Sequence, residues 1–312
     1  MLDVPVLLIV YRRPDLTAQV MRAIAQARPR RLLVAADGPK SAAEGAACAA
    51  ARAAATTVTW PCEVKTDFAA ANLGCRARVH SALDWFFTEC ESGIVLEDDC
   101  LPAPDFFPFC AALLEHYRDD SRVMHISGET YRAGPRPESS YYFSKYALIW
   151  GWATWRRAWR LADPQMRTWP AFSRDAPRLA LFDSGDEEAY WQGAFQQMYE
   201  GRIDTWDYPW MYACLTHGLS IHPAVNLVRN IGTPDGATHM TTNPFVGRGV
   251  GTLEAALRHP AWLVRDRQAD MDTFDDRFVG AVLKRQRTWR HQAGRPLRWA
   301  RRLLRRAGAP CV

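Results

Sequence analysis

Three carboxylates in a row, Glu97, Asp98 and Asp99, directly follow a run of apolar residues. Neighbouring like charges repel one another, so such a triplet needs a cation or several hydrogen-bond donors beside it. Mg²⁺ and Mn²⁺ suit this role, because each takes one or two carboxylates and fills its other positions with water and substrate phosphates. The triplet therefore predicts a site for a divalent cation or a charged ligand.

The alternative role for the triplet is structural. Acidic residues also gather at the N-terminus of a helix, where they meet the helix dipole. Here Pro102 and Pro104 delay the next helix to about Asp105, so the three acids lie upstream of it. We expect them at the end of a strand, with Phe106 and Phe107 anchoring the helix to the core.

The elements that must position these acids alternate between strand and helix. Apolar runs predict strands at residues 5–11, 31–38, 58–65 and 94–97. Helical spacing of apolar residues predicts helices at 15–27, 41–55 and 77–87, the first of them capped by Asp15. This alternation is typical of an α/β fold in which helices cover both faces of a mostly parallel central sheet.

The second half of the chain is less regular. We expect strands at 123–128, at 141–150 and from Ser220, a loop entering a helix at 150–160, and helices at 187–201 and after Pro209. Residues beyond Gly251 have helical composition. We expect one domain over residues 1–250 and a helical, Arg-rich extension over residues 251–312.

Charged residues fall at the ends of three predicted strands. Arg12 and Arg13 follow the first strand, Asp37 ends the second, and the acidic triplet ends the fourth. In open α/β sheets, ligands bind beyond the carboxyl ends of the strands. These residues should therefore line one crevice.

The sequence lacks the motifs of several protein classes. No GxGxxG follows the first strand and no GxxxxGK[ST] occurs, which disfavours dinucleotide-dependent oxidoreductases and P-loop nucleotidases. The eight cysteines form no CxxC pair, so we expect free thiols in a reducing compartment. The N-terminal apolar run is too short for a secretory signal, and no window approaches the roughly 18 apolar residues of a membrane span. We expect a cytoplasmic protein.

The charge of the chain is unevenly distributed. The net charge is +5, yet nine Arg and one Lys lie between Lys284 and Arg306 without any acid, so the rest of the chain is acidic overall. Leu297, Ala300 and Leu303 recur there at helical spacing, which predicts a basic amphipathic helix able to lie on the inner face of an anionic membrane. A solvated tail is the alternative. Nucleic acid is disfavoured as a partner, because no recognised binding fold accompanies the basic segment.

Several segments together resemble a known family. The strand that ends in EDD and continues into PDFF is similar to the DXD-type motif of GT-A fold glycosyltransferases, which use nucleotide-diphosphate sugars. The likeness is closest to the α-mannoside N-acetylglucosaminyltransferase I family and its bacterial sugar-transferase relatives. PVLLIVYRRPDL, VAADG, ANLGCR, LIWGWATW, TWDYPW and NLVRNIG follow in the order of that family. The resemblance implies a Rossmann-like GT-A fold.

The resemblance also implies a metal and a donor sugar at the triplet. Asp99 would bind the Mn²⁺ or Mg²⁺ that bridges the diphosphate. Asp98 would contact the ribose or share the metal, and Glu97 would contact the donor sugar.

On the nucleotide side, the resemblance implies contacts from the ends of the first two strands and from the loop before the third helix. Asp37 would accept a hydrogen bond from the nucleobase. Arg12 or Arg13 would contact the diphosphate or the nucleoside, and the sequence leaves open which of the two faces the site. Asn72 and Arg76 are further candidates for binding the nucleotide.

Inverting glycosyl transfer needs a carboxylate that takes the proton of the acceptor hydroxyl. Asp207 fits this role, because it lies between Trp206 and Tyr208, where its pKa could be raised. The related enzymes carry two adjacent acids here, whereas this chain carries one, so Asp204 is the runner-up. The alternative for Asp207 is an N-cap of the following helix.

Aromatic residues and a histidine complete the implied site. Trp150, Trp152 and Trp155 would form a wall shared by donor sugar and acceptor, because indole faces stack on pyranose rings, and Gly151 would allow close approach of the backbone. A plain aromatic core is the alternative. His239 would be a further metal ligand, or else a solvated loop residue.

The sequence thus predicts a metal-dependent, inverting hexosyltransferase of polysaccharide biosynthesis. It would move a sugar from a nucleotide-diphosphate donor to a glycan or lipid-linked glycan. Two alternatives remain: a nucleotidyltransferase that forms nucleotide sugars, and a non-catalytic glycan-binding module on the same fold.

Overall fold

The computed structural model describes residues 1–135, 137–175, 181–232, 249–254, 256–278 and 280. Two predictions fall outside these residues, namely the role of His239 and the amphipathic helix between Lys284 and Arg306. The division into a domain of residues 1–250 and an extension likewise stays a prediction.

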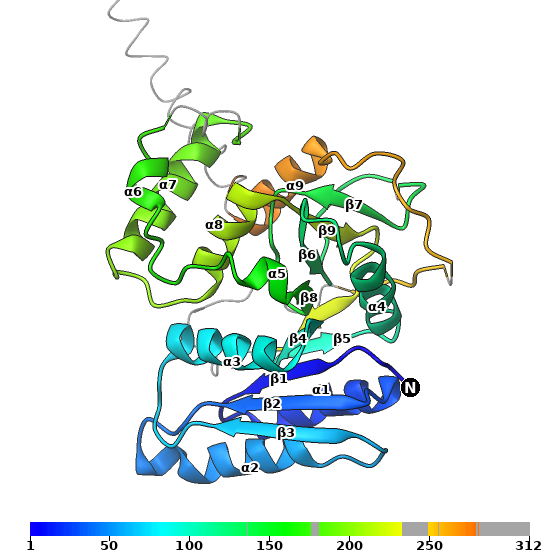
Figure 1. Ribbon diagram of the computed structural model, residues 1–312, viewed down its shortest axis with the longest axis vertical. Coiled ribbons are helices and arrows are strands. Elements are labelled where there is room, and N and C mark those ends of the chain that lie inside the picture. The colour runs from blue at the N-terminus through cyan, green and yellow to red at the C-terminus, as the bar shows by residue number, and fades with distance from the viewer. Residues whose placement is uncertain (136, 176–180, 233–248, 255, 279, 281–312) are drawn as a thin grey trace, which may run out of the picture.

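One eight-stranded sheet runs through the molecule (Figure 1). Its strands are, in spatial order, β3 (Glu63–Phe68), β2 (Arg31–Ala36), β1 (Val6–Val10), β4 (Ser92–Glu97), β8 (Trp152–Trp155), β6 (Val123–Ser127), β9 (Leu219–Pro223) and β7 (Tyr141–Ser144). The pairs from β3 to β4 are parallel, as is β6 with β9, whereas β8 and β7 pair antiparallel with their neighbours. β4 and β6 therefore point the same way, and their carboxyl ends lie at the same edge of the sheet as those of β1 and β2.

Helices cover both faces of the sheet, which confirms the α/β class. On one face lie α1 (Pro14–Ala27), α2 (Gly45–Thr56) and α4 (Phe106–His116), and on the other α3 (Cys75–Glu89) and α8 (Asp207–His217), with α7 (Gly185–Tyr199) packed against α8. The shorter elements are a 3₁₀ turn (Ala42–Glu44), α5 (Arg156–Trp159) and α6 (Trp169–Phe172), and a small antiparallel pair of β5 (Cys100–Pro102) and β10 (Val228–Asn230). The last described helix, α9 (Arg267–Arg277), contacts β7.

The strand β1 illustrates why the apolar runs fold this way. Val6, Leu8 and Val10 face the core under α1 and α4, whereas Leu7 and Ile9 face the core under α3 and α8. All five residues are buried. A central parallel strand needs apolar side chains on both faces, so a continuous run forms it, not an alternating one.

Four sequence predictions need correction. Asp15 does not cap α1: the helix starts at Pro14 and its N-cap is Arg13. The third strand begins at Glu63, later than predicted, because Trp60 packs in the core and donates its indole N–H to the carbonyl of Pro29 before the strand begins.

The two other corrections concern the second half of the chain. The segment Trp152–Trp155, predicted as a loop, is strand β8, which lies between β4 and β6. The helix predicted after Pro209 already starts at Asp207. Both segments are rich in aromatic residues, whose apolar pattern does not distinguish strand from helix over so few residues.

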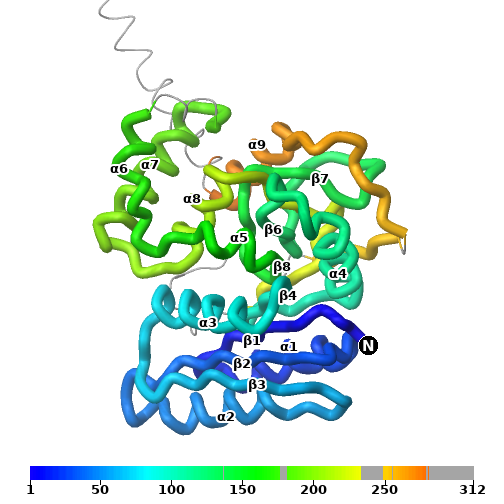
Figure 2. The backbone as a smooth tube through the Cα atoms, in the orientation of Figure 1, coloured from blue at the N-terminus to red at the C-terminus, as the bar shows by residue number. Residues whose placement is uncertain are grey.

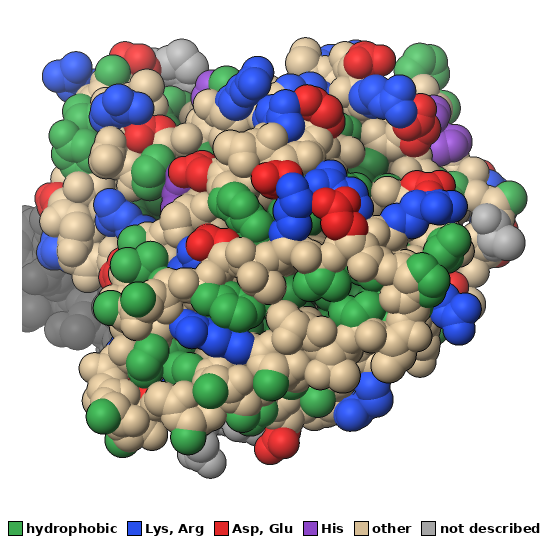
Figure 3. Space-filling model, turned by 60° about the horizontal axis from the view of Figure 1, so that its bottom comes forward, with side chains coloured by type: hydrophobic (Ala, Val, Ile, Leu, Met, Phe, Trp, Pro, Cys, Tyr) green, Lys and Arg blue, Asp and Glu red, His purple; other side chains and the backbone are tan. Residues whose placement is uncertain are grey.

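The surface seen from below the sheet is mixed in charge. In the view of Figure 3, Lys and Arg side chains alternate with Asp and Glu in the upper half, whereas the lower half carries only a few isolated charges. Among the described residues, no helix combines the length and the apolar content that crossing a membrane requires. The described cysteines (Cys48, Cys62, Cys75, Cys90, Cys100, Cys110 and Cys214) are all free thiols, as predicted.

Candidate active site

The carboxyl ends of β1, β2 and β4 meet at one edge of the sheet. Ile9 pairs with Glu97 and Val10 with Ala36, so the residues that follow these strands emerge side by side. Together with α3 they enclose a pocket. It is lined by Ile9, Val10, Tyr11, Arg12, Arg13, Asp37, Lys40, Asn72, Gly74, Cys75, Arg78, Val79, Glu97 and Asp98. The structure therefore brings together in one pocket the residues that the sequence placed at three separate strand ends, except Asp99, which is not among the lining residues.

Arg13 is the cation that faces the acidic triplet. Its guanidinium donates from Nη2 to Asp98 Oδ1 and from Nη1 to Asp99 Oδ2, the latter over 2.9 Å. The backbone N–H of Tyr11 also points at Asp98, with 3.4 Å between N and Oδ2. Asp98 is buried and Arg13 is partly buried. One guanidinium thus contacts two of the three acids, which shows that Arg13, not Arg12, faces the triplet.

The third acid, Glu97, lies in surroundings that disfavour its charged form. Burial raises its pKa to about 8, and the neighbouring Asp99 and Asp98 carboxylates add to the rise. Burial also raises the pKa of Asp98 to about 6, with Arg13 opposing the rise. A carboxyl whose pKa lies this far above the usual range is typical of a ligand site, because the structure holds it in place at a cost in stability.

A pH profile of stability tests this environment of Glu97. The native pKa lies above the unfolded value of 4.5, so the native state binds the proton more tightly, and the free energy of unfolding should fall as pH rises from about 4.5 to about 8. We expect Glu97→Gln, which cannot ionise, to match the wild type near pH 4.5 and to exceed it by about 1–3 kcal/mol at pH 8.5. Urea unfolding at a series of pH values measures this difference.

The control for this variant lies at the other end of the same strand. Glu91 precedes β4, and its side chain is 81% exposed. Glu91→Gln should leave the slope of stability against pH unchanged between pH 4.5 and 8.5. An identical pH profile for Glu97→Gln and the wild type would contradict a raised pKa at Glu97.

Asp37 anchors the loop on the opposite side of the pocket. Its Oδ1 accepts from the backbone N–H groups of Gly38 (2.8 Å) and Leu73 (2.9 Å), and its Oδ2 accepts from the amide of Asn72 (2.8 Å). Gly38 lies so close to Ala71 that a Cβ would come within 2.3 Å of the Ala71 carbonyl carbon. In this structure, Asp37 and Asn72 bind each other and fix the loop that lines the pocket.

The other two predicted arginines differ in position. Arg12 lines the pocket but forms an ion pair of 2.7 Å with Glu44, away from the triplet. Arg76 is not among the residues that line the pocket. Arg78, two residues further along α3, lines it instead, and its guanidinium donates to the carboxylate and carbonyl of Asp67. Sequence reasoning missed Arg78, because helical spacing alone does not tell which of two arginines faces the sheet edge.

The candidate base lies close to the triplet. Asp207 is the first residue of α8, not its N-cap, which is Trp206, and its carboxylate accepts a hydrogen bond from the Thr205 hydroxyl. Its negative charge adds to the raised pKa of Glu97. The runner-up, Asp204, lies beside Gly74, where a Cβ would be 3.2 Å from Asp204 Oδ2. Both acids therefore approach the rim of the pocket from the α8 side.

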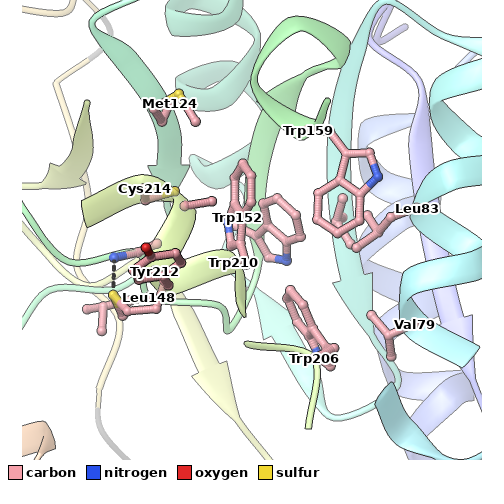
Figure 4. Close-up of a cluster of buried hydrophobic side chains, with 14 of the residues drawn as sticks. Val79, Leu83, Met124, Leu148, Trp152, Trp159, Trp206, Trp210, Tyr212 and Cys214 are labelled. Atoms are coloured by element: carbon pink, nitrogen blue, oxygen red, sulfur yellow. Dashed lines mark hydrogen bonds between the residues drawn. The ribbon is translucent and has the colours of Figure 1, made fainter. Parts of the chain in front are cut away.

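Two of the three predicted wall tryptophans belong to the core. Trp152 is 1% and Trp155 is 2% exposed, and they lie on opposite faces of β8. Trp152 packs against both Trp206 and Trp210 (Figure 4). Trp155 donates its indole N–H to the carbonyl of Leu114. Trp152 and Trp155 therefore do not form the expected sugar-binding wall, because strand β8 directs them into the hydrophobic core. Trp150 is partly exposed.

The turn that carries Trp150 is held by Glu129, which was not predicted from the sequence as a site residue. Glu129 lies just beyond β6 at the same sheet edge and is buried; it accepts from the backbone N–H of Trp150 (2.9 Å) and from the hydroxyl of Tyr131 (3.0 Å). Gly151 has a φ of 66°, and a Cβ there would lie 2.7 Å from a Val228 methyl group. Glu129 directly follows the fifth predicted strand, in the segment ISGE, and this position at a strand end could have marked it as a site residue.

The residues present can supply part of a binding site for a divalent cation. Asp99 offers hard carboxylate oxygens, with its side chain 18% exposed and paired with the pocket residue Arg13. Within the described ranges, no group of three or more His, Cys, Asp and Glu side chains is arranged to hold a metal. Mg²⁺ or Mn²⁺ does not need one, because water and substrate phosphates supply most of its ligands. The backbone at Gly232 lies beside Asp99, where a Cβ would be 2.7 Å from Asp99 Oδ2.

The fold and the site define an α/β protein with a pocket of mixed charge at the carboxyl edge of its sheet. No protein-family model and no curated protein matches the sequence. Among solved structures, a UDP-glucose pyrophosphorylase complexed with UDP-glucose matches with a TM-score of 0.33 and 10% identity, covering 52% of this chain and 79% of that one. A mannose-1-phosphate geranyltransferase from Thermus thermophilus matches with a TM-score of 0.36 and 13% identity, covering 72% and 74%.

A third solved structure is mouse xyloside xylosyltransferase 1 in its apo form. It matches with a TM-score of 0.31 and 11% identity, covering 68% of this chain and 81% of that one. All three likenesses are distant, and no residue of this chain is assigned a role from them.

Proposed function

We propose that this protein is a metal-dependent, inverting glycosyltransferase that uses a nucleotide-diphosphate sugar. The observation that carries the proposal is the pocket at the sheet edge, which joins the Asp37–Asn72 loop at one side to Glu97, Asp98 and Arg13 at the other. A nucleotide sugar could extend across this pocket, with its base and ribose at the Asp37–Asn72 loop and its diphosphate and sugar at Arg13 and the acids. The proximity of Asp207 to Glu97 supports a base next to the sugar end.

On the donor side, each residue takes a role suited to its position. The Asp37–Asn72 loop binds the nucleoside, and Asp98 binds the ribose. Arg13 offers a fork of N–H donors that matches phosphate oxygens as well as the carboxylates it now contacts. Asp99, with His239 further along the chain, would hold Mn²⁺ or Mg²⁺, which when bound neutralises charge on the leaving diphosphate.

On the acceptor side, Asp207 takes the proton of the attacking hydroxyl. The oxygen of that hydroxyl forms a bond to the anomeric carbon while the bond from this carbon to the diphosphate oxygen breaks on the opposite face. The nucleoside diphosphate leaves with the electron pair, and the proton stays on Asp207. The acceptor is a glycan or a lipid-linked glycan, and the basic C-terminal segment would hold the protein on the inner membrane surface.

A thermal-shift panel tests the donor site. The full chain is heated with UDP-, GDP- and dTDP-sugars, each with Mn²⁺ and with a chelator in its place. A ligand at a hundredfold excess over its Kd stabilises the native state by about 2.7 kcal/mol, so one nucleotide class should raise the Tm by several degrees. Chelation should remove most of this rise.

The matched control is Asp99→Ala, which should respond to the nucleotide equally with and without Mn²⁺. If no nucleotide sugar raises the Tm of the wild type in the presence of Mn²⁺, the proposed function is rejected. Protection by free glycans alone would favour the glycan-binding module instead.

A further inference from the structure

A lysine at the pocket, Lys40, carries a charge that no acid of the protein pairs with. Its side chain is exposed, and it lines the pocket three residues after Asp37. Over the part of the chain that the structure describes, the ammonium group of Lys40 forms no ion pair. The elements that enclose this pocket, β1, β2 and α3, lie side by side in the blue and cyan part of the chain (Figure 2).

The other three cations that line the pocket are each paired with an acid. The pairs are Arg12 with Glu44, Arg13 with Asp98 and Asp99, and Arg78 with Asp67. An anionic ligand that binds one of these arginines competes with a carboxylate for the guanidinium. An anion that binds Lys40 breaks no ion pair, so its attraction to this lysine is not reduced by the loss of an existing contact.

The backbone of Lys40 is held in place by Glu44, the last residue of the 3₁₀ turn. The N–H of Lys40 donates to Glu44 Oε2 over 2.8 Å, and the hydroxyl of Tyr11 donates to the same oxygen. The other carboxylate oxygen, Oε1, accepts from Arg12 at 2.7 Å. The loop that carries Lys40 is therefore tied to the residues that directly follow β1.

These connections place Lys40 between the two parts of the pocket that the proposed function assigns to the donor. Asp37, three residues earlier in the chain, belongs to the loop assigned to the nucleoside. Through Glu44, Lys40 is joined to Tyr11, two residues before Arg13, which is assigned to the diphosphate. In a nucleotide-diphosphate sugar, the phosphate next to the ribose lies between the nucleoside and the second phosphate. This order of groups brings that phosphate nearest to Lys40.

We propose that Lys40 binds the phosphate next to the ribose, so that it selects ligands with a phosphate on the nucleoside and leaves the second phosphate to Arg13. The inference rests on the proposed function. An ammonium group acts on phosphate as a point charge with three rotatable donors, so it needs no fixed fork geometry. A flexible lysine on a fixed backbone can therefore meet this phosphate.

Titrations of the full-length protein followed by ligand-observed NMR test this inference without metal or turnover. The probes are uridine with UMP, guanosine with GMP and thymidine with dTMP, since the members of each pair differ by one phosphate. We expect the wild type to bind the monophosphate of at least one pair about tenfold more tightly than its nucleoside, because the phosphate adds a charge-assisted hydrogen bond.

Two substitutions of Lys40 separate its charge from its place in the loop. Lys40→Met should reduce the preference for the monophosphate to about twofold or less, because the remaining cations are paired with acids. Lys40→Arg should keep most of the preference, because the positive charge remains. The Kd of the nucleoside should stay unchanged in both variants, since the backbone N–H that Glu44 accepts from is still present.

Lys65→Met is the matched control, since Lys65 is 40% exposed, pairs with Glu89 at 2.6 Å and does not line the pocket. This variant should keep the full preference. The inference is overturned if the wild type binds no monophosphate more tightly than its nucleoside, or if Lys40→Met keeps the preference. Weaker nucleoside binding in Lys40→Met would also overturn it, because the substitution would then act on the loop and not on a phosphate contact.

These outcomes are independent of the test of the proposed function. Thermal protection by nucleotide sugars, together with an unchanged phosphate preference in Lys40→Met, rejects the role of Lys40 alone. A phosphate preference that depends on Lys40, without protection by any nucleotide sugar, rejects the proposed function and keeps a nucleotide-binding site.

Discussion

Asp207→Asn should bind the donor as tightly as the wild type and lose transfer. The amide cannot take the proton of the acceptor hydroxyl, and general-base catalysis contributes about 10²- to 10⁴-fold to the rate of such a step. Because Asp207 borders the rim and is not among the residues lining the nucleotide pocket, the Kd of the nucleotide sugar should change less than threefold. Single-turnover transfer and a binding titration measure the two quantities separately.

The control for Asp207→Asn is Asp204→Asn, which removes the neighbouring acid on the same approach to α8. This variant should keep at least a third of the wild-type rate. A transfer rate that survives in Asp207→Asn and fails in Asp204→Asn would assign the base to Asp204. Normal rates in both variants would show that neither Asp207 nor Asp204 is the catalytic base.

Arg13→Met should be destabilised in a manner that depends on pH. The variant leaves the buried Asp98 and the partly buried Asp99 without their guanidinium. Breaking a buried pair costs about 3–5 kcal/mol, and we expect about 2 kcal/mol here because the side chain of Arg13 is 23% exposed. The loss should be full at pH 8 and shrink towards pH 4, where protonation removes the stranded charges. Binding of the nucleoside diphosphate should be lost as well.

Arg12→Met provides the matched comparison for this variant. Arg12 is the preceding residue in the chain, and its ion pair with Glu44 is largely exposed, with the arginine side chain 45% accessible. Exposed pairs contribute about 0–1 kcal/mol, so this variant should unfold close to the wild type at every pH. Equal stability losses in the two variants would contradict the assignment of Arg13 as the residue that offsets the charges of Asp98 and Asp99.

The sequence was sufficient to predict the sheet edge and its charges. Continuous apolar runs identified β1, β2 and β4, because a central parallel strand has no polar face. The residues that follow these strands then had to share one edge, which brought Arg13, Asp37 and Glu97 into a single pocket. This part of the site follows from strand direction alone.

The sequence was less informative where aromatic residues dominate. From sequence alone, the segment Trp152–Trp155 could form a sugar-binding wall or part of the hydrophobic core. Only its pairing between β4 and β6 shows that it belongs to the core. Glu129, just beyond β6, binds the backbone N–H of Trp150, which lies 21 residues further along the chain. Such contacts depend on tertiary packing, which no local pattern encodes.

The central claim is that the pocket cleaves a nucleotide-diphosphate sugar, and analysis of the products tests it most directly. The full chain is incubated with the nucleotide sugar that protects it best, with Mn²⁺ and without acceptor, and the nucleotides are separated by anion exchange. We predict slow release of nucleoside diphosphate and free sugar, abolished by chelation and in Asp99→Ala. Formation of a nucleotide sugar and pyrophosphate from a nucleoside triphosphate and a sugar 1-phosphate, with no nucleoside diphosphate released, would contradict the account and identify a nucleotidyltransferase.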